Sequence, residues 1–269
     1  MIDILLPVYN GEKFLKEQIY SIFCQTYHDF RVVIRDDSST DRSRDIINEY
    51  AMNPRVKIVE DSKGNLGSTK SFEELVSYVE GDYFMFCDQD DIWKPNKVEI
   101  TLAKMMEEEG RYPETPILVC TDSTCVDQDG IVISESFYTS QKFEYTFDSR
   151  EKMAALNVIQ GNTCMLNKMC KQYIHDIPSD VVYDAWVGLT VAYFGRVFYL
   201  HEQTLYYRQH SHNAVGVKNI SYHYFTNKYL HNKDWSRKNS LLLNSLPYKL
   251  NYTKWLFWKI YYTVKRSIL

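Results

Sequence analysis

The sequence lacks any run of about 20 uninterrupted apolar residues, the length that a helix needs to cross a membrane. Its N-terminal residues run straight into an apolar segment that contains Pro7, so we expect no signal peptide. The six cysteines form no C-x-x-C pair and no metal-binding spacing, which favours a reduced, cytoplasmic protein. We find no internal repeat and no low-complexity linker. These absences leave a folded enzyme or binding domain.

The charges are divided unevenly along the chain. Residues 218–269 contain ten Lys and Arg against one acid, Asp234, which gives +9. Residues 1–217 then hold 21 basic and 34 acidic side chains, which gives −13. We therefore expect an acidic body, 1–217, followed by a basic, aromatic tail, 218–269, with an anionic partner. We expect that partner to be a membrane surface and not a nucleic acid.

Apolar runs and helical spacings alternate in the first part of the chain. We expect strands at 2–8, 31–35, 56–59 and 83–87, and helices at 12–25, 41–50, 70–79 and 97–109. Further strands are expected at 117–120, 131–134, 197–200 and 205–207, with a helix at 183–192. This alternation predicts an α/β fold with a mostly parallel central sheet covered by helices.

Polar clusters follow three of the first four strands: Tyr9-Asn10, Asp36-Asp37 and Asp88-Gln89-Asp90-Asp91. Ligands bind beyond the carboxyl ends of such strands, so the clusters indicate the site. The three carboxylates at 88–91 repel one another unless a cation lies among them, and their hard oxygen ligands suit Mg²⁺ or Mn²⁺. A solvated acidic turn before a helix would leave the same pattern.

Five ordered motifs resemble those of the family 2 glycosyltransferases with the GT-A (Rossmann-like) fold. They are Leu6–Glu12, Gln25–Tyr27, Arg35–Asp41, Asn65–Gly67 and Asp88–Asp91, within a match over residues 1–215. The string at 86–93 resembles the bacterial rhamnosyltransferase-like branch. The resemblance implies a nucleotide-binding half at 1–110, an acceptor half at 111–217 and a separate helical tail.

The resemblance also implies a donor site and a metal site. The donor residues would be Pro7, Tyr9, Asn10, Glu12, Asp37, Asn65, Lys70, Asp88 and Arg208. Among them, Asp37 would accept the N3–H of a uracil or thymine base, although a helix N-cap is the alternative. Arg208 would bind phosphate in bidentate fashion. Mn²⁺ or Mg²⁺ would be held by Asp90, Asp91 and His210.

The resemblance places the catalytic base at Asp184. An inverting transfer needs a carboxylate within reach of the acceptor hydroxyl. Tyr183 stands where the family usually has an acid or a histidine, and Gln160–Thr163 resembles an acceptor-side loop. An Asp at a helix N-terminus that interacts with the helix dipole is the alternative.

The last 20 residues separate into an apolar arc and a basic arc on a helical wheel. This pattern is typical of a helix that lies on anionic lipid at the inner face of the cell membrane. A helix docked on the core or on a second subunit of a homo-oligomer is the alternative.

The motifs and the tail together predict an inverting glycosyltransferase that takes part in surface polysaccharide synthesis. It would use a dTDP- or UDP-sugar, with L-rhamnose as a candidate, and a glycan or lipid-linked acceptor. The alternatives are a sugar nucleotidyltransferase, which would need a Gly-rich loop after the first strand, and a non-catalytic glycan-binding protein.

Overall fold

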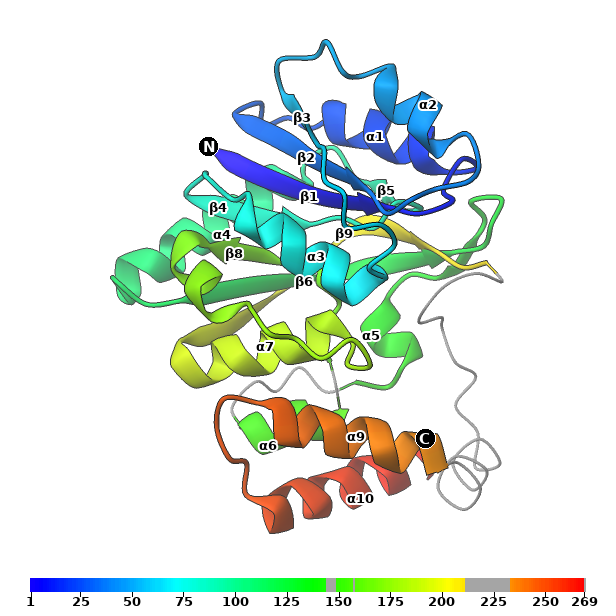
Figure 1. Ribbon diagram of the computed structural model, residues 1–269. Helices are drawn as coiled ribbons and strands as arrows, with labels where there is room; N and C mark the ends of the chain where they lie inside the picture. The colour runs from blue at the N-terminus through cyan, green and yellow to red at the C-terminus, as the bar shows by residue number, and fades with distance from the viewer. Residues whose placement is uncertain (144–148, 157, 211–232, 269) are drawn as a thin grey trace.

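The computed structural model describes residues 1–143, 149–156, 158–210 and 233–268 (Figure 1). The strands are β1 (Ile2–Val8), β2 (Phe30–Asp36), β3 (Val56–Val59), β4 (Tyr83–Phe86), β5 (Ile92–Trp93), β6 (Ile117–Val126), β7 (Val132–Ser134), β8 (Met165–Asn167) and β9 (Arg196–Arg208). The helices are α1 (Leu15–Phe23), α2 (Ser43–Asn48), α3 (Ser68–Ser77), α4 (Lys97–Arg111), α5 (Phe137–Ser140), α6 (Arg150–Leu156), α7 (Tyr183–Phe194), α9 (Lys233–Ser245) and α10 (Tyr252–Ile268), with 3₁₀ turns η1 (Gly161–Thr163) and η2 (Lys168–Tyr173).

These strands form one mixed, mostly parallel sheet in the order β3-β2-β1-β4-β8-β6-β9-β5, with β7 beside β6. The first four pair in parallel, because a helix returns the chain between each of β1, β2, β3 and β4. Helices α3 and α7 contact each other on one face of the sheet, and α4 packs on β6 and β8 (Figure 1). The expected α/β architecture is confirmed.

The second half of the sheet differs from the sequence-based prediction at β6 and β9. The strands expected at 197–200 and 205–207 are one strand, β9, which pairs with β6 from Ile117 to Val126 with two register shifts. The polar middle of β6 hid its length, yet Thr121 and Thr124 are buried. The Thr121 and Thr204 hydroxyls lie 2.6 Å apart and satisfy each other inside the sheet.

The C-terminal helix α10 packs against α6 at the lower end of the molecule (Figure 1). Trp255 and Tyr262 of this helix are buried. Just before α10, the Tyr248 hydroxyl donates to the carbonyl of Leu189 in α7 over 2.9 Å. The alternative of a helix docked on the core therefore describes one face of α10. Within the described residues, none of the helices has the length and apolar character needed to cross a membrane.

Candidate active site

The turn after β1 is held against the loop after β2 by the side chains of Asn10 and Glu12. Thr40 donates its N–H to Asn10 Oδ1 over 2.8 Å, and Arg42 donates its N–H to Glu12 Oε2 over 3.0 Å. Asn10 lies at φ 47°, in the left-handed region that Asn adopts more readily than most residues. Two of the predicted donor residues thus build the frame of the site, while Tyr9 is 47% exposed beside them.

Gln89, for which no role was predicted, joins the acidic loop to this turn. Its Oε1 accepts the N–H of Tyr9 over 2.8 Å, and its Nε2 donates to the Tyr9 carbonyl over 3.0 Å. Gly11 passes so close that a Cβ there would lie 2.5 Å from Gln89 Oε1. The predicted donor residue Pro7 lies just before, in β1 opposite Arg35. In the sequence, the only sign of this contact is the glycine that follows Asn10.

Asp37 is buried at the end of β2, where it holds the loop that carries Asn65. Its Oδ1 accepts the N–H of Leu66 over 2.7 Å, and its Oδ2 accepts the N–H of Gly67 over 2.8 Å. The guanidinium of Arg35 pairs with the same carboxylate. Asn65 itself is exposed. These contacts show that Asp37 holds the loop in place. Its contact with a nucleotide base stays a prediction.

Lys70 lies in the first turn of α3 and pairs with Glu73, with 2.7 Å between Nζ and Oε2. Glu73 also accepts the N–H of Asp176 over 2.8 Å. The neighbouring Thr69 hydroxyl donates to the carbonyl of Val181 over 2.8 Å. The start of α3 is thereby joined to the segment that leads into α7. The predicted donor contact of Lys70 would have to form beside this ion pair.

Asp91 is fully buried and joins three elements. Asn162 Nδ2 in η1 donates to its Oδ2 over 2.5 Å, and the N–H of Arg208 donates to its Oδ1 over 3.1 Å. The Arg208 guanidinium donates to the Asp90 carbonyl over 3.0 Å and pairs with Glu17 at 2.6 Å. These contacts make Asp91 and Arg208 supports of the acidic loop, and their roles as a metal ligand and a phosphate ligand stay predictions.

Asp90 and His210 form the partly buried part of the predicted metal site, with side chains 18% and 10% exposed, respectively. His210 Nε2 lies 2.9 Å from Asp90 Oδ2, and its ring stacks on Phe14 with centroids 5.0 Å apart. No group of three His, Cys, Asp or Glu side chains is arranged for a metal within the described residues. Mg²⁺ and Mn²⁺ are often held by one or two protein ligands together with phosphate oxygens. The Asp90–His210 pair fits such an ion.

Asp184 lies in the first turn of α7 and faces the acidic loop. Burial raises the pKa of Asp184 to about 7, while the backbone N–H groups of Ala185 and Gly161 act in the opposite direction. Burial, and then the charges of Asp90 and Asp184, raise the pKa of Asp88 to about 8. The structure therefore brings Asp88, Asp90 and Asp184 together. Asp184 Oδ1 is buried and has no hydrogen-bond partner among the described residues.

Tyr183 is buried beside Asp184 and packs as an aromatic core residue. Its ring stacks on Phe72 at 4.1 Å and meets Phe86 edge-on at 5.2 Å. Its hydroxyl approaches Gly161 so closely that a Cβ there would lie 2.0 Å away. Tyr183 thus fixes the start of α7 against η1, and so fixes the position of Asp184.

Comparisons with known proteins bear on the family and the fold. The sequence profile described as "Glycosyl transferase family 2" matches residues 3–160. A Bacillus subtilis protein named for teichuronic acid biosynthesis, TuaG, is 29% identical over 130 residues, or 48% of this chain and 51% of that protein. The chain spans about half the length of the curated relatives that it matches.

Solved structures share the fold at low sequence identity. Residues 1–349 of Staphylococcus aureus TarS in complex with UDP-GlcNAc are 17% identical, with a TM-score of 0.64 over 98% of this chain and 72% of that chain. The mannosyltransferase PcManGT of Pyrobaculum calidifontis, solved with GDP-Man and Mn²⁺, is 17% identical, with a TM-score of 0.55 over 80% of this chain and 58% of that chain. These likenesses establish a GT-A-like fold.

Proposed function

The chain belongs to glycosyl transferase family 2, and from that premise we propose an inverting transfer of a sugar from a nucleotide-diphosphate sugar to an acceptor hydroxyl. The observation that carries the proposal is the carboxyl of Asp184. It has a pKa of about 7 and an unbonded Oδ1, and it lies near the acidic loop at the carboxyl ends of the parallel strands. A general base is most effective when its pKa lies near the working pH.

Asp184 would accept the proton of the acceptor hydroxyl as that oxygen bonds to the anomeric carbon. The bond from the anomeric carbon to the diphosphate oxygen breaks at the same time, and the electron pair leaves with the nucleoside diphosphate. Attack from the side opposite the leaving group inverts the anomeric centre. Gly161 and Tyr183 would keep the carboxylate in place during this step.

Asp90 and His210 would hold Mn²⁺ or Mg²⁺, which as a Lewis acid neutralises charge on the departing diphosphate. Asp91 would support the acidic loop without contacting the ion, because its oxygens already accept hydrogen bonds from Asn162 and from the backbone of Arg208. Arg208 would position the loop through its contact with the Asp90 carbonyl. Asp88 would then face the donor sugar or the ribose.

The donor base would lie over the exposed Tyr9, between the turns that carry Asn10 and Asn65. We propose a pyrimidine nucleotide, and the string at 86–93 favours dTDP-L-rhamnose over UDP-hexoses. The TarS complex holds UDP-GlcNAc and the PcManGT complex holds GDP-Man, so the fold accommodates more than one base.

The acceptor would be a growing glycan or a lipid-linked precursor of a surface polysaccharide, as the name of the Bacillus subtilis relative suggests. We place the reaction at the inner face of the cell membrane, because the tail is strongly basic.

A thermal-shift panel tests the donor side of this proposal. UDP-, dTDP- and GDP-sugars are added with Mn²⁺ or with EDTA, since a ligand that binds the folded state raises its stability. We expect the largest shift for a pyrimidine nucleotide sugar with Mn²⁺, and its loss in Asp90→Asn. An equal shift in EDTA would argue against the cation, and a larger shift with GDP-sugars would argue against the pyrimidine.

A further inference from the structure

Helix α10 has two faces of different character, and one of them is docked. Trp255 and Tyr262 are 5% and 3% exposed against the body of the protein. Lys259 Nζ donates to the carbonyl of Ala155 in α6 over 2.7 Å, and the Arg266 guanidinium lies 4.7 Å from the centre of the Phe143 ring. This face, with two buried aromatic side chains and two cations on protein partners, therefore anchors the helix.

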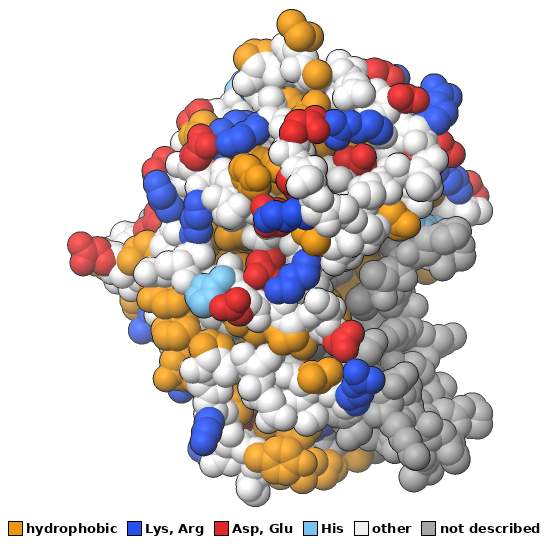
Figure 2. Space-filling model, in the orientation of Figure 1, with side chains coloured by type: hydrophobic (Ala, Val, Ile, Leu, Met, Phe, Trp, Pro, Cys, Tyr) orange, Lys and Arg blue, Asp and Glu red, His pale blue; other side chains and the backbone are white. Residues whose placement is uncertain are grey.

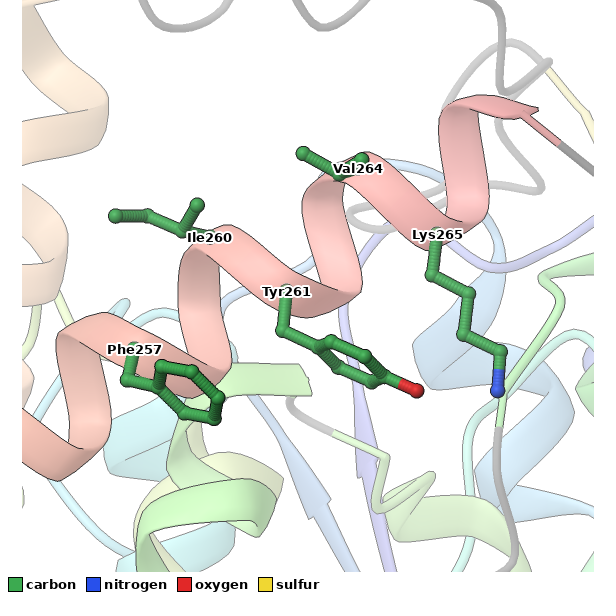
Figure 3. A pocket seen from close by; sticks show the side chains of 5 residues that line it. All are labelled: Phe257, Ile260, Tyr261, Val264 and Lys265. Carbon is green, nitrogen blue, oxygen red and sulfur yellow. The ribbon is translucent and has the colours of Figure 1, made fainter.

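The opposite side, here called the outer face of α10, consists of Phe257, Ile260, Tyr261 and Val264. These side chains are 59%, 57%, 41% and 50% exposed, respectively. With Lys265 they line a hollow of about 400 Å³ (Figure 3). Hydrophobic side chains also gather at this end of the molecule in the space-filling view, whereas charged side chains of both signs are mixed over the sheet domain (Figure 2). Large apolar side chains on consecutive turns are a costly surface to leave in water.

The charges around the outer face are all of one sign along the helix. Exposed Lys254 and half-buried Lys265 lie three helical turns apart, and helical spacing places both on the side that carries Phe257 and Tyr261. Residues 249–269 contain five Lys and Arg and no Asp or Glu. An apolar strip bordered by cations matches a bilayer that presents anionic headgroups above acyl chains. A second copy of the same face would instead bring two sets of cations together.

We propose that the outer face of α10 lies in the interfacial layer of an anionic membrane, with Lys254 and Lys265 at the lipid phosphates. Phe257, Ile260, Tyr261 and Val264 enter the acyl boundary, while the docked face stays on α6. Because α6 also contacts α7, the membrane-bound helix holds the element that carries Asp184. The biological purpose rests on the proposed lipid-linked acceptor, but the lipid contact itself does not.

Vesicle binding by the full chain, without donor or metal, tests the proposal. Wild-type protein is mixed with phosphatidylcholine vesicles that contain or lack phosphatidylglycerol, and the pelleted fraction is measured. We expect binding only to the anionic vesicles. The double variant Phe257→Ser, Ile260→Ser should weaken it by about tenfold or more, since each side chain loses its burial. Lys254→Gln and Lys265→Gln should each weaken it by about fivefold, and added salt should remove only that electrostatic share.

Matched controls separate this surface from general stickiness. Met52→Ser removes an apolar side chain that is 94% exposed on the loop after α2, and Lys168→Gln removes an exposed charge at η2. Neither should change vesicle binding. Point substitutions are used because deletion of α10 would also remove Trp255 and Tyr262 from the core. Equal melting temperatures of the variants check that each still folds.

Two results would overturn the proposal. The first is that the wild type binds both kinds of vesicle equally or binds neither. The second is that the control variants weaken vesicle binding as much as the variants of the outer face do. Sedimentation that shows a dimer dissociated by Phe257→Ser, Ile260→Ser would assign the face to a second copy instead. Sugar transfer to a water-soluble acceptor is measured in parallel. Loss of transfer with intact vesicle binding counts against the proposed function alone, and the reverse counts against the membrane contact alone.

Discussion

The acidic side chains of the candidate site fall into two groups that differ in how they are bonded. Asp37 and Asp91 are 2% and 0% exposed, and each accepts backbone N–H groups or side-chain donors on both of its oxygens. Asp184 retains a buried oxygen without a partner among the described residues, and it shares its surroundings with Asp88. The first group supports the loops. The second is left with unsatisfied capacity that a substrate can use.

The largest effect that sharpens this comparison is expected from Asp184→Asn. Loss of a general base should lower kcat by about 10²–10⁴-fold. Donor affinity should remain near that of the wild type, because the proposed contact of Asp184 is with the acceptor hydroxyl. Steady-state kinetics and calorimetry measure the two quantities. Asp180→Asn, an exposed acid just before α7, is the matched control and should keep full activity. A variant at 184 with more than a tenth of wild-type turnover would give the role to another residue.

Asp37→Asn should act on stability instead. The change leaves Arg35 with only Asp61 as its carboxylate partner, and breaking a buried ion pair should lower the free energy of unfolding by about 3 kcal/mol. Denaturant unfolding measures this loss. Asp36→Asn is the control, because Asp36 accepts one N–H, from Ser39, worth about 1 kcal/mol. An unchanged stability in Asp37→Asn would remove Asp37 from the supporting group and strengthen its predicted contact with the base.

Gly11→Ala should have a smaller effect, about 1–3 kcal/mol of lost stability, because its Cβ would overlap Gln89 Oε1. Adding Gln89→Ala should cost less in this background than in the wild type, since the clash is then gone. Gly110→Ala in α4 meets no atom within 4 Å and should be neutral or slightly stabilising. Additive losses in the double variant would mean that the two residues do not touch.

A change is also expected in the pH dependence of the free energy of unfolding. The carboxyl of Asp184 has a pKa of about 7 in the folded protein and 3.8 in an unfolded chain. Between these values the folded state binds more protons, so this group makes the free energy of unfolding fall as pH rises. Asp184→Asn lacks this contribution, and its stability relative to the wild type should increase from pH 4 to pH 7. Melting curves that stay parallel would indicate an ordinary pKa.

The sequence predicted the strands that are plain apolar runs between turns. Strands β1 and β3 have the expected bounds, because apolar runs bounded by turns define them. It failed at β6 and β9, where buried threonines pair across the sheet and look like a loop. For the tail it left membrane and core as alternatives, and the structure docks one face of α10 on the body of the protein while the opposite face is exposed. The docked face could not be recognised because Lys259 and Arg266 reach protein partners that are more than 100 residues away in the sequence.

The candidate site shows the same limit. The resemblance located the acidic loop and Asp184, and the structure brings Asp88, Asp90 and Asp184 together. The partners that occupy Asp37, Asp91 and Arg208 come from distant segments, such as Leu66, Asn162 and Glu17. A residue type at the correct spacing indicates that a side chain is near a site. Only its contacts indicate whether it supports the site or is available to a substrate.

The measurement that tests the central claim most directly is the pH dependence of kcat/KM for sugar transfer, compared between wild type, Asp184→Glu and Asp184→Asn. If Asp184 is the base, wild-type kcat/KM rises with pH with an apparent pKa near 7. Asp184→Glu should keep a rise at reduced rate, and the residual activity of Asp184→Asn should show none. The same rise near pH 7 in Asp184→Asn would contradict the account and place the base elsewhere.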